Sequence, residues 1–126
     1  VDVVAGQGTI AIEMLEDVPQ IDTLVIPVGG GGLCAGMALW AKHVKPNCRV
    51  YGVQTAMCPS MRAALRGEKP PVLHTHTLAD GIAVKNPGVI TSAILKELVD
   101  DILLVDEVDV ETAVQVLAAQ QKLVAE

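Results

Sequence analysis

The feature that most constrains the fold is a run of four consecutive glycines: Gly29, Gly30, Gly31 and Gly32. Before the run, residues 23–28 (TLVIPV) are apolar and β-branched, which predicts a fully buried strand of a parallel sheet. After it, apolar residues follow the spacing of one helical face as far as Pro46: Leu33, Met37, Trp40, Ala41 and Val44. A strand–glycine–helix unit directs free N–H groups and the positive end of a helix dipole at one point, which favours binding of a phosphate group.

Three interpretations of the glycine run are open. A purely structural turn is disfavoured because each glycine costs roughly 0.5–1 kcal/mol relative to alanine. A dinucleotide-binding fingerprint fits loosely over Gly30, Gly32 and Ala35, but Gln54 stands where that motif has an acidic residue after the next strand. The third interpretation is a site for the phosphate of a smaller cofactor, in which glycine leaves room for the anion and allows positive φ angles.

The composition suits one modest domain of 126 residues. The chain is 51% hydrophobic, and this apolar excess predicts that chain outside this sequence or another subunit covers part of the surface. Apolar runs stay well below the roughly 20 residues that span a bilayer, so no membrane partner is expected. The net charge of −6, without a basic cluster, argues against nucleic-acid binding. Cys34, Cys48 and Cys58 lack CxxC spacing, so reduced thiols and a cytoplasmic location are expected.

The order of elements predicts an α/β fold, with a mostly parallel open sheet flanked by helices. Residues 1–5 are expected to end a strand, and residues 6–9 (GQGT) to turn into a helix. The inner face of that helix is predicted to carry four apolar residues: Ala11, Met14, Leu15 and Val18. Later elements are expected in the following order: a strand over 49–55, helices over 60–66 and 91–99, and a strand over 101–105.

The last predicted helix begins with Asp106 and Asp109, whose spacing resembles a capping box. Its inner face is expected to contain Val110, Ala113, Val114 and Leu117. The helix reaches residue 126 without a stop signal, and both ends of the sequence are interpreted as cut. Residues 1–126 are therefore expected to be an internal piece of a longer chain.

Five segments resemble those of threonine dehydratases in order and spacing: residues 5–11 (AGQGTIA), 28–33 (VGGGGL), 79–85 (ADGIAVK), 98–102 (LVDDI) and 122–126 (KLVAE). Threonine dehydratases are grouped with serine racemase and serine dehydratase in the β-family, or fold type II, of pyridoxal-phosphate enzymes. The resemblance extends over essentially the whole sequence. It implies that residues 1–126 form part of the larger, cofactor-binding domain of such an enzyme.

The resemblance implies a site for pyridoxal 5′-phosphate. Its phosphate group would be held by the backbone amides of Gly29, Gly30, Gly31, Gly32 and Leu33. Gly81 resembles the family glycine whose backbone passes close to the cofactor ring, with a simple Asp-Gly turn as the alternative interpretation. Glu126 matches a glutamate that lies beside the cofactor in the family.

The family's covalent lysine lies in a Ser-[Phe/Tyr]-Lys-x-Arg-Gly stretch that this sequence lacks. Lys85 follows the third matching segment but gains no catalytic role from the resemblance. Lys42, Lys45 and Lys96 are expected to be solvated. No catalytic residue is therefore assigned within the sequence, and the 126-residue chain by itself is expected to be inactive.

No metal site is expected. His74 and His76 lie in a polar loop without a third ligand at matching spacing, which favours a pair of solvated side chains. The serine-racemase branch of the family has a divalent-cation site built partly from a Glu and an Asp, and Gln54 and Ser60 occupy the corresponding positions here. Replacing two anionic oxygens removes most of the affinity for a hard cation.

The resemblance implies a lyase that converts L-threonine to 2-oxobutanoate and ammonia, with L-serine as a second substrate and a homo-oligomeric full-length protein. A serine racemase or a serine-preferring dehydratase is the alternative within the same chemistry. A non-catalytic phosphate- or nucleotide-binding module is the alternative from another class.

Overall fold

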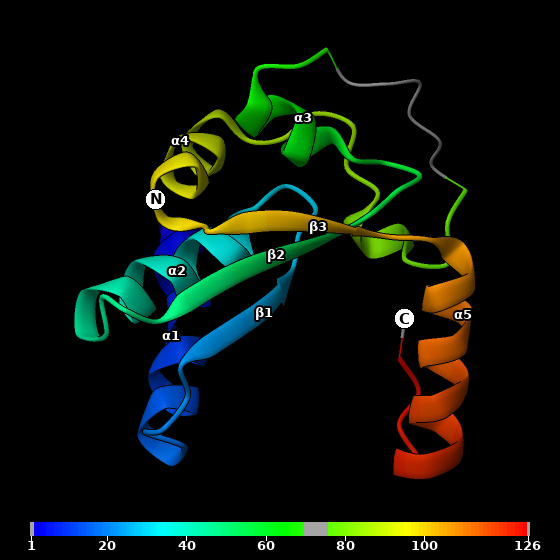
Figure 1. Ribbon diagram of the computed structural model, residues 1–126, viewed down its shortest axis with the longest axis horizontal. Coiled ribbons are helices and arrows are strands. Elements are labelled where there is room, and N and C mark those ends of the chain that lie inside the picture. The colour runs from blue at the N-terminus through cyan, green and yellow to red at the C-terminus, as the bar shows by residue number, and fades with distance from the viewer. Residues whose placement is uncertain (1, 70–75, 126) are drawn as a thin grey trace.

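A computed structural model describes residues 2–69 and 76–125, in which helices and parallel strands alternate (Figure 1). The elements follow in this order: α1 (Asp2–Asp17), β1 (Thr23–Pro27), α2 (Gly32–Val44), β2 (Arg49–Thr55), α3 (Ser60–Arg66), the 3₁₀ turn η1 (Asp80–Ile82), α4 (Val89–Leu98), β3 (Asp101–Val105), α5 (Glu107–Val116) and the π turn η2 (Leu117–Gln121). The three strands form one parallel sheet in the order β1-β2-β3. The predicted α/β class is confirmed, and β2 and β3 have the predicted bounds.

One face of the sheet forms the core. Leu24 and Ile26 of β1, Val50 of β2 and Ile102 of β3 point to this face and are at most 2% exposed. They belong to one cluster with Ala35, Met37, Ala38 and Ala41 of α2, Met61 of α3 and Leu95 of α4. Because the side-chain period of a strand is two, these residues alternate with those on the other face.

The other face of the sheet is largely bare in the described part of the chain. Val25 is 65% exposed and Leu103 46%, and the register places Val25 beside Tyr51 and Val53 beside Leu103. The expectation that residues 23–28 form a fully buried strand was therefore wrong for this face. The apolar excess of the sequence lies partly here, on a largely apolar surface that no described helix covers.

The N-terminal segment corrects the sequence prediction. Residues 1–5 were expected to end a strand and residues 6–9 to form a turn, but α1 runs continuously through the described part of both. The reason is a close crossing with α2: a Cβ on Gly36 would lie 2.2 Å from the carbonyl oxygen of Val4 and 2.7 Å from the nitrogen of Gly8. Of the two glycines in the GQGT stretch, Gly8 permits this contact, because a Cβ there would lie 3.0 Å from the carbonyl oxygen of Gly36, and neither makes a turn.

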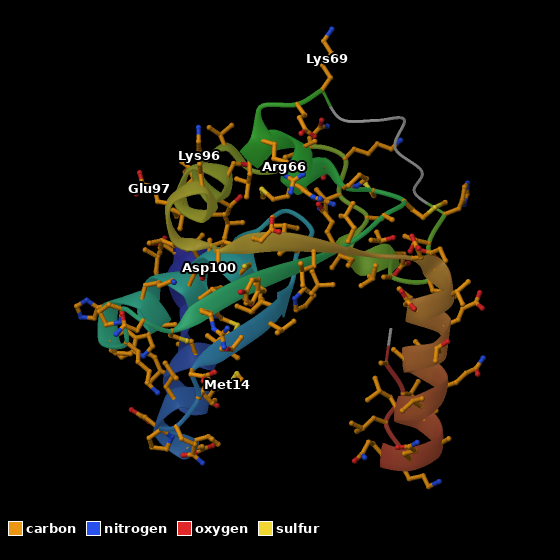
Figure 2. The ribbon with its side chains drawn as sticks, viewed as in Figure 1. Met14, Arg66, Lys69, Lys96, Glu97 and Asp100 are labelled. Atoms are coloured by element: carbon orange, nitrogen blue, oxygen red, sulfur yellow. The ribbon has the colours of Figure 1, made fainter. Side chains whose placement is uncertain are left out.

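The predicted inner face of α1 is confirmed in part. Ala11 is buried together with Val4 and Gly8, and Leu15 packs against the core. Met14 and Val18 are instead about 40% exposed (Met14 is labelled in Figure 2). Beside the crossing, an apolar cavity of about 450 Å³ is lined by Trp40 and His43 of α2 together with residues of α1. The aromatic ring centroids of Trp40 and His43 lie 5.9 Å apart.

Two lysines that were expected to be solvated connect elements instead. Nζ of Lys42 in α2 lies 3.1 Å from Oδ2 of Asp100 (Asp100 is labelled in Figure 2). The same oxygen accepts a 2.7 Å hydrogen bond from the N–H of Val50. Lys45 donates to the carbonyl oxygens of Pro19 and Ile21 at 2.6 and 2.5 Å. These contacts fix the C-terminal end of α2 and the start of β2 relative to the segment after α1 and the start of β3.

The C-terminal helix stands apart from the sheet. In Figure 1, α5 (orange) leaves the end of β3 and lies away from α1 and α2, with Val114 only half-buried. The expected capping box was wrong: within the described chain, the side chain of Asp106 caps no N–H group of α5, and the N–H of Asp109 donates to the backbone oxygen of Asp106. No helix among the described residues has both the length and the apolar character needed to cross a membrane.

Candidate functional site

The junction between β1 and α2 gathers backbone donors at one point. The N–H of Val28 still donates to Val53, at 2.8 Å, and the next paired N–H is that of Ala35, which donates to Gly31. Six residues lie between them: Gly29, Gly30, Gly31, Gly32, Leu33 and Cys34. The N–H groups of the first three have no acceptor among the described residues, and those of the last three lie in the first turn of α2, where a helix leaves its N–H groups without a partner. Such a row of donors at the positive end of a helix dipole binds anions.

The four glycines differ in backbone conformation and in the space available for a side chain. Gly31 caps α2 with φ 90°, and a Cβ there would lie 2.6 Å from Cε of Met61. A Cβ on Gly29 would lie 3.0 Å from the Cα of Ile82. At Gly32, in contrast, an added Cβ would meet no atom of the described chain within 4 Å. Neighbouring protein atoms occupy the space beside Gly29 and Gly31, and Gly31 has the positive φ angle that the sequence predicted for the run. Binding of the anion by these residues stays a prediction.

Three distant segments hold the junction in place. The hydroxyl of Thr91 in α4 donates to the carbonyl oxygen of Gly30 at 2.6 Å. Val84 packs against Gly29: a Cβ built on Gly29 would lie 3.1 Å from Cγ2 of Val84. The backbone oxygen of Val84 also accepts a short hydrogen bond from the hydroxyl of Ser60. The structure thus brings α3, α4 and the segment around Gly81 to the glycine run, although none of these contacts is evident from the sequence.

Gly81 lies next to this junction. It lines an open cavity of about 280 Å³ with Pro27, Ala79 and Ile82, and most of the lining is apolar. No atom of the described chain lies within 4 Å of a Cβ built on Gly81. An aromatic ring fits such a lining, beside donors that fit a phosphate group. Glu126 and His74 lie outside the described residues. His76 is exposed and is distant in sequence from the glycine run.

Gln54 and Ser60 take part in internal hydrogen bonds. Gln54 is fully buried, and its Oε1 accepts from the N–H of Arg62 in the first turn of α3 at 3.2 Å. A buried side chain in this position is out of reach of a ribose, which argues against the dinucleotide interpretation.

In the described ranges, 2–69 and 76–125, no three His, Cys, Asp or Glu side chains gather as metal ligands. The absence of a metal site stays a prediction.

Glu107 anchors the loop that leads to Gly81, a role that the sequence did not suggest. Its carboxylate accepts hydrogen bonds from the hydroxyls of Thr77 and Thr55, at 2.5 and 3.0 Å, and from the N–H of Leu78 at 3.0 Å. These bonds, with that from Thr77 the largest contribution, lower the pKa of the Glu107 carboxyl. The ionised carboxylate therefore ties this loop to the end of β2 and the start of α5.

Cys34 lies in the first turn of α2, where a helix N-terminus commonly activates a thiol. Here burial dominates and raises the pKa of the Cys34 thiol to about 12. The thiol therefore remains protonated at neutral pH. Only the backbone N–H of this residue is available to an anion.

The fold and this junction define an α/β protein with an anion-binding turn between a parallel strand and a helix. The chain belongs to the pyridoxal-phosphate-dependent enzymes: residues 1–126 match the family described as "Pyridoxal-phosphate dependent enzyme". Its members use pyridoxal phosphate as their cofactor, as the resemblance implied.

The relatives include two kinds of enzyme. An L-threonine ammonia-lyase of Thermotoga maritima is 47% identical over 125 residues, which cover 98% of this chain and 31% of that protein. The serine racemase of Mus musculus is 42% identical, with 98% of this chain and 37% of the relative covered. The chain thus spans about a third of the length of these curated relatives.

Solved structures show the same fold. The processed form of threonine deaminase isoform 2 from Solanum lycopersicum aligns with a TM-score of 0.90 and 35% identity, covering 98% of this chain and 36% of that chain. Maize serine racemase aligns with a TM-score of 0.89 and 33% identity, covering 96% and 38%. The chain therefore has the fold of this part of the fold type II enzymes.

Proposed function

We propose that this chain is part of the cofactor-binding domain of an L-threonine ammonia-lyase, which converts L-threonine to 2-oxobutanoate and ammonia and also accepts L-serine. Similarity to the ammonia-lyase of Thermotoga maritima, at 47% identity, supports the substrate assignment. The observation that carries the cofactor site is the row of free N–H groups between β1 and the first turn of α2.

In this proposal, the N–H groups of Gly29, Gly30, Gly31, Gly32 and Leu33 bind the phosphate group of pyridoxal phosphate. The ring lies in the apolar cavity beside Gly81, where a glycine leaves room for it. The place of Glu126 beside the cofactor rests on the resemblance alone. A ring held in this cavity would exclude water from the wall formed by Pro27 and Ile82.

When bound, pyridoxal phosphate withdraws electrons from the α-carbon of an amino acid, which acidifies its proton. The residues of this chain would contribute binding and orientation: the donors at the junction would hold the phosphate group, and the Gly81 segment would contact the ring. The group that takes the α-proton is a lysine outside this sequence, as the resemblance implies. Inactivity of the 126-residue chain by itself stays a prediction.

Serine racemase is the second candidate function, favoured by the 42% identity with the enzyme of Mus musculus. A non-catalytic nucleotide-binding module is disfavoured by the family match and by the burial of Gln54. Homo-oligomeric assembly and a cytoplasmic location, the latter based on three unpaired cysteines, stay predictions.

The test is to assay the full-length protein with L-threonine and L-serine. The proposal expects 2-oxobutanoate and ammonia from L-threonine, with a higher kcat/KM than for pyruvate from L-serine. Chiral chromatography of the serine remaining in the same reactions detects racemisation. Fast formation of D-serine with little 2-oxobutanoate identifies a racemase and contradicts the proposal.

A further inference from the structure

The first turn of α4 holds the glycine junction through a single carbonyl group. The carbonyl oxygen of Gly30 accepts from the hydroxyl of Thr91 at 2.6 Å and, at the longer distance of 3.4 Å, from the N–H of Gly88. Thr91 lies 61 residues from Gly30 in the sequence. The close approach depends on Gly88, because a Cβ there would lie 2.7 Å from Oγ1 of Thr91.

The hydroxyl of Thr91 has one hydrogen and two possible acceptors, Gly30 at 2.6 Å and Gly88 at 3.0 Å. The carbonyl oxygen of Gly88 already accepts from the side chain of Ser92, at 2.7 Å, and from its N–H, at 2.9 Å. The hydroxyl hydrogen of Thr91 is therefore available to Gly30, which is also the nearer acceptor.

The orientation of this carbonyl fixes the orientation of the next donor. The C=O of Gly30 and the N–H of Gly31 belong to one planar trans peptide group, in which they point in opposite directions. Because Thr91 holds the oxygen on the side of α4, the N–H of Gly31 points away from α4. Gly31 has φ 90°, and without this anchor a glycine peptide rotates easily.

We propose that Thr91 is a positioning residue for the cofactor phosphate: by binding the carbonyl of Gly30, it turns the N–H of Gly31 toward the anion. The inference rests on the proposed phosphate site. It assigns a ligand-directed role to α4, whose residues do not belong to the glycine motif. Thr91 also packs against Gly31, since a Cβ on Gly31 would lie 3.0 Å from Cβ of Thr91. A purely structural role must therefore be separated by experiment.

The experiment compares Thr91→Val, Thr91→Ser and the unmodified full-length protein after removal of the cofactor. Valine keeps the packing and removes the hydroxyl, whereas serine keeps the hydroxyl. Thr112→Val is the matched control, because in the described part of the chain the hydroxyl of Thr112 donates to the carbonyl oxygen of Val108 within α5. Each protein is titrated with pyridoxal phosphate and with pyridoxal, which has the same ring but no phosphate, and the ³¹P chemical shift of the bound phosphate is recorded.

We expect Thr91→Val to weaken binding of pyridoxal phosphate about tenfold, as for loss of one well-aligned hydrogen bond to an ionised group, and to shift the ³¹P signal. Binding of pyridoxal stays unchanged, and Thr91→Ser restores the preference for the phosphorylated ligand. If Thr91→Val does not fold, Thr91→Ala removes the same hydroxyl and takes its place. An unchanged preference in the valine or alanine variant overturns the inference. If the unmodified protein shows no preference for pyridoxal phosphate, the phosphate site itself is wrong.

Discussion

At the residue scale, the glycines at the junction differ in what they contact. Gly29 and Gly31 are enclosed by Ile82, Val84 and Met61, whereas the position of a side chain on Gly32 is empty in the described chain. Sequence reasoning located the run and the strand and helix beside it, because their patterns are local. It could not separate the four glycines, because the atoms that enclose them come from segments 30 to 60 residues away.

Gly32→Ala is expected to separate ligand binding from folding. Alanine at the first position of α2 meets no described atom and raises helix propensity by about 1 kcal/mol, so the apo-protein stays as stable or gains stability. Binding of pyridoxal phosphate weakens, because a methyl group hinders N–H bonds to phosphate that each contribute about 1.5–3 kcal/mol. Urea unfolding of the apo-protein and cofactor titration measure the two effects.

Gly31→Ala serves as the matched comparison. The positive φ angle and the 2.6 Å approach to Met61 lower the stability of the apo-protein by about 1–3 kcal/mol. Gly31 is therefore a poor probe of the ligand, because its substitution lowers stability as well as changing the site. Equal cofactor affinity in Gly32→Ala and the unmodified protein would count against the phosphate site.

At the scale of elements, the α1–α2 crossing is the main departure from the sequence prediction. The GQGT stretch has the composition of a turn, and local propensity favours one. The structure forms a helix there because Gly8 and Gly36 allow two backbones to approach closely, which is a tertiary effect. The same limitation explains the capping box at Asp106, which matched a local pattern but makes no side-chain cap in the described chain.

Gly36→Ala is expected to destabilise the protein by about 3 kcal/mol, because its Cβ would overlap the backbone of Val4 and Gly8. Gly6→Ala is the control on the same helix pair: its Cβ meets no described atom within 4 Å, and it stabilises α1 by about 0.5–1 kcal/mol. Circular dichroism during urea unfolding measures both. If Gly36→Ala unfolds at the same urea concentration as the unmodified protein, the close crossing is refuted.

At the scale of the whole molecule, Asp100 connects α2, β2 and the start of β3 through Lys42 and the N–H of Val50. The hydrogen bond from Val50, followed by the interactions with Lys42, lowers the pKa of the Asp100 carboxyl below its ordinary value of 3.8, against the opposing effect of burial. Since the folded-state pKa is depressed, the stabilisation is complete above about pH 5 and is lost as the pH falls through the ordinary and then the folded-state pKa.

Asp100→Asn should therefore flatten the dependence of unfolding free energy on pH in this acidic range, with little change in slope near neutrality. Urea unfolding at a series of pH values below pH 5 gives the comparison. The control is Asp22→Asn, because the side chain of Asp22 is 80% exposed and its 3.9 Å contact with Arg49 is a weak surface pair. A pH profile of Asp100→Asn that matches the unmodified protein would contradict this role.

The single tryptophan and the single tyrosine of the chain lie in different environments, which provides two optical reporters. Trp40 lines the cavity between α1 and α2, and Tyr51 lies on the bare face of the sheet beside Val25. The sequence contains no phenylalanine and no second tryptophan or tyrosine. Emission from Trp40 therefore changes when α1 and α2 separate. Emission from Tyr51 changes when another segment or molecule covers the bare face of the sheet. One intrinsic-fluorescence experiment can thus resolve the two events without any added label.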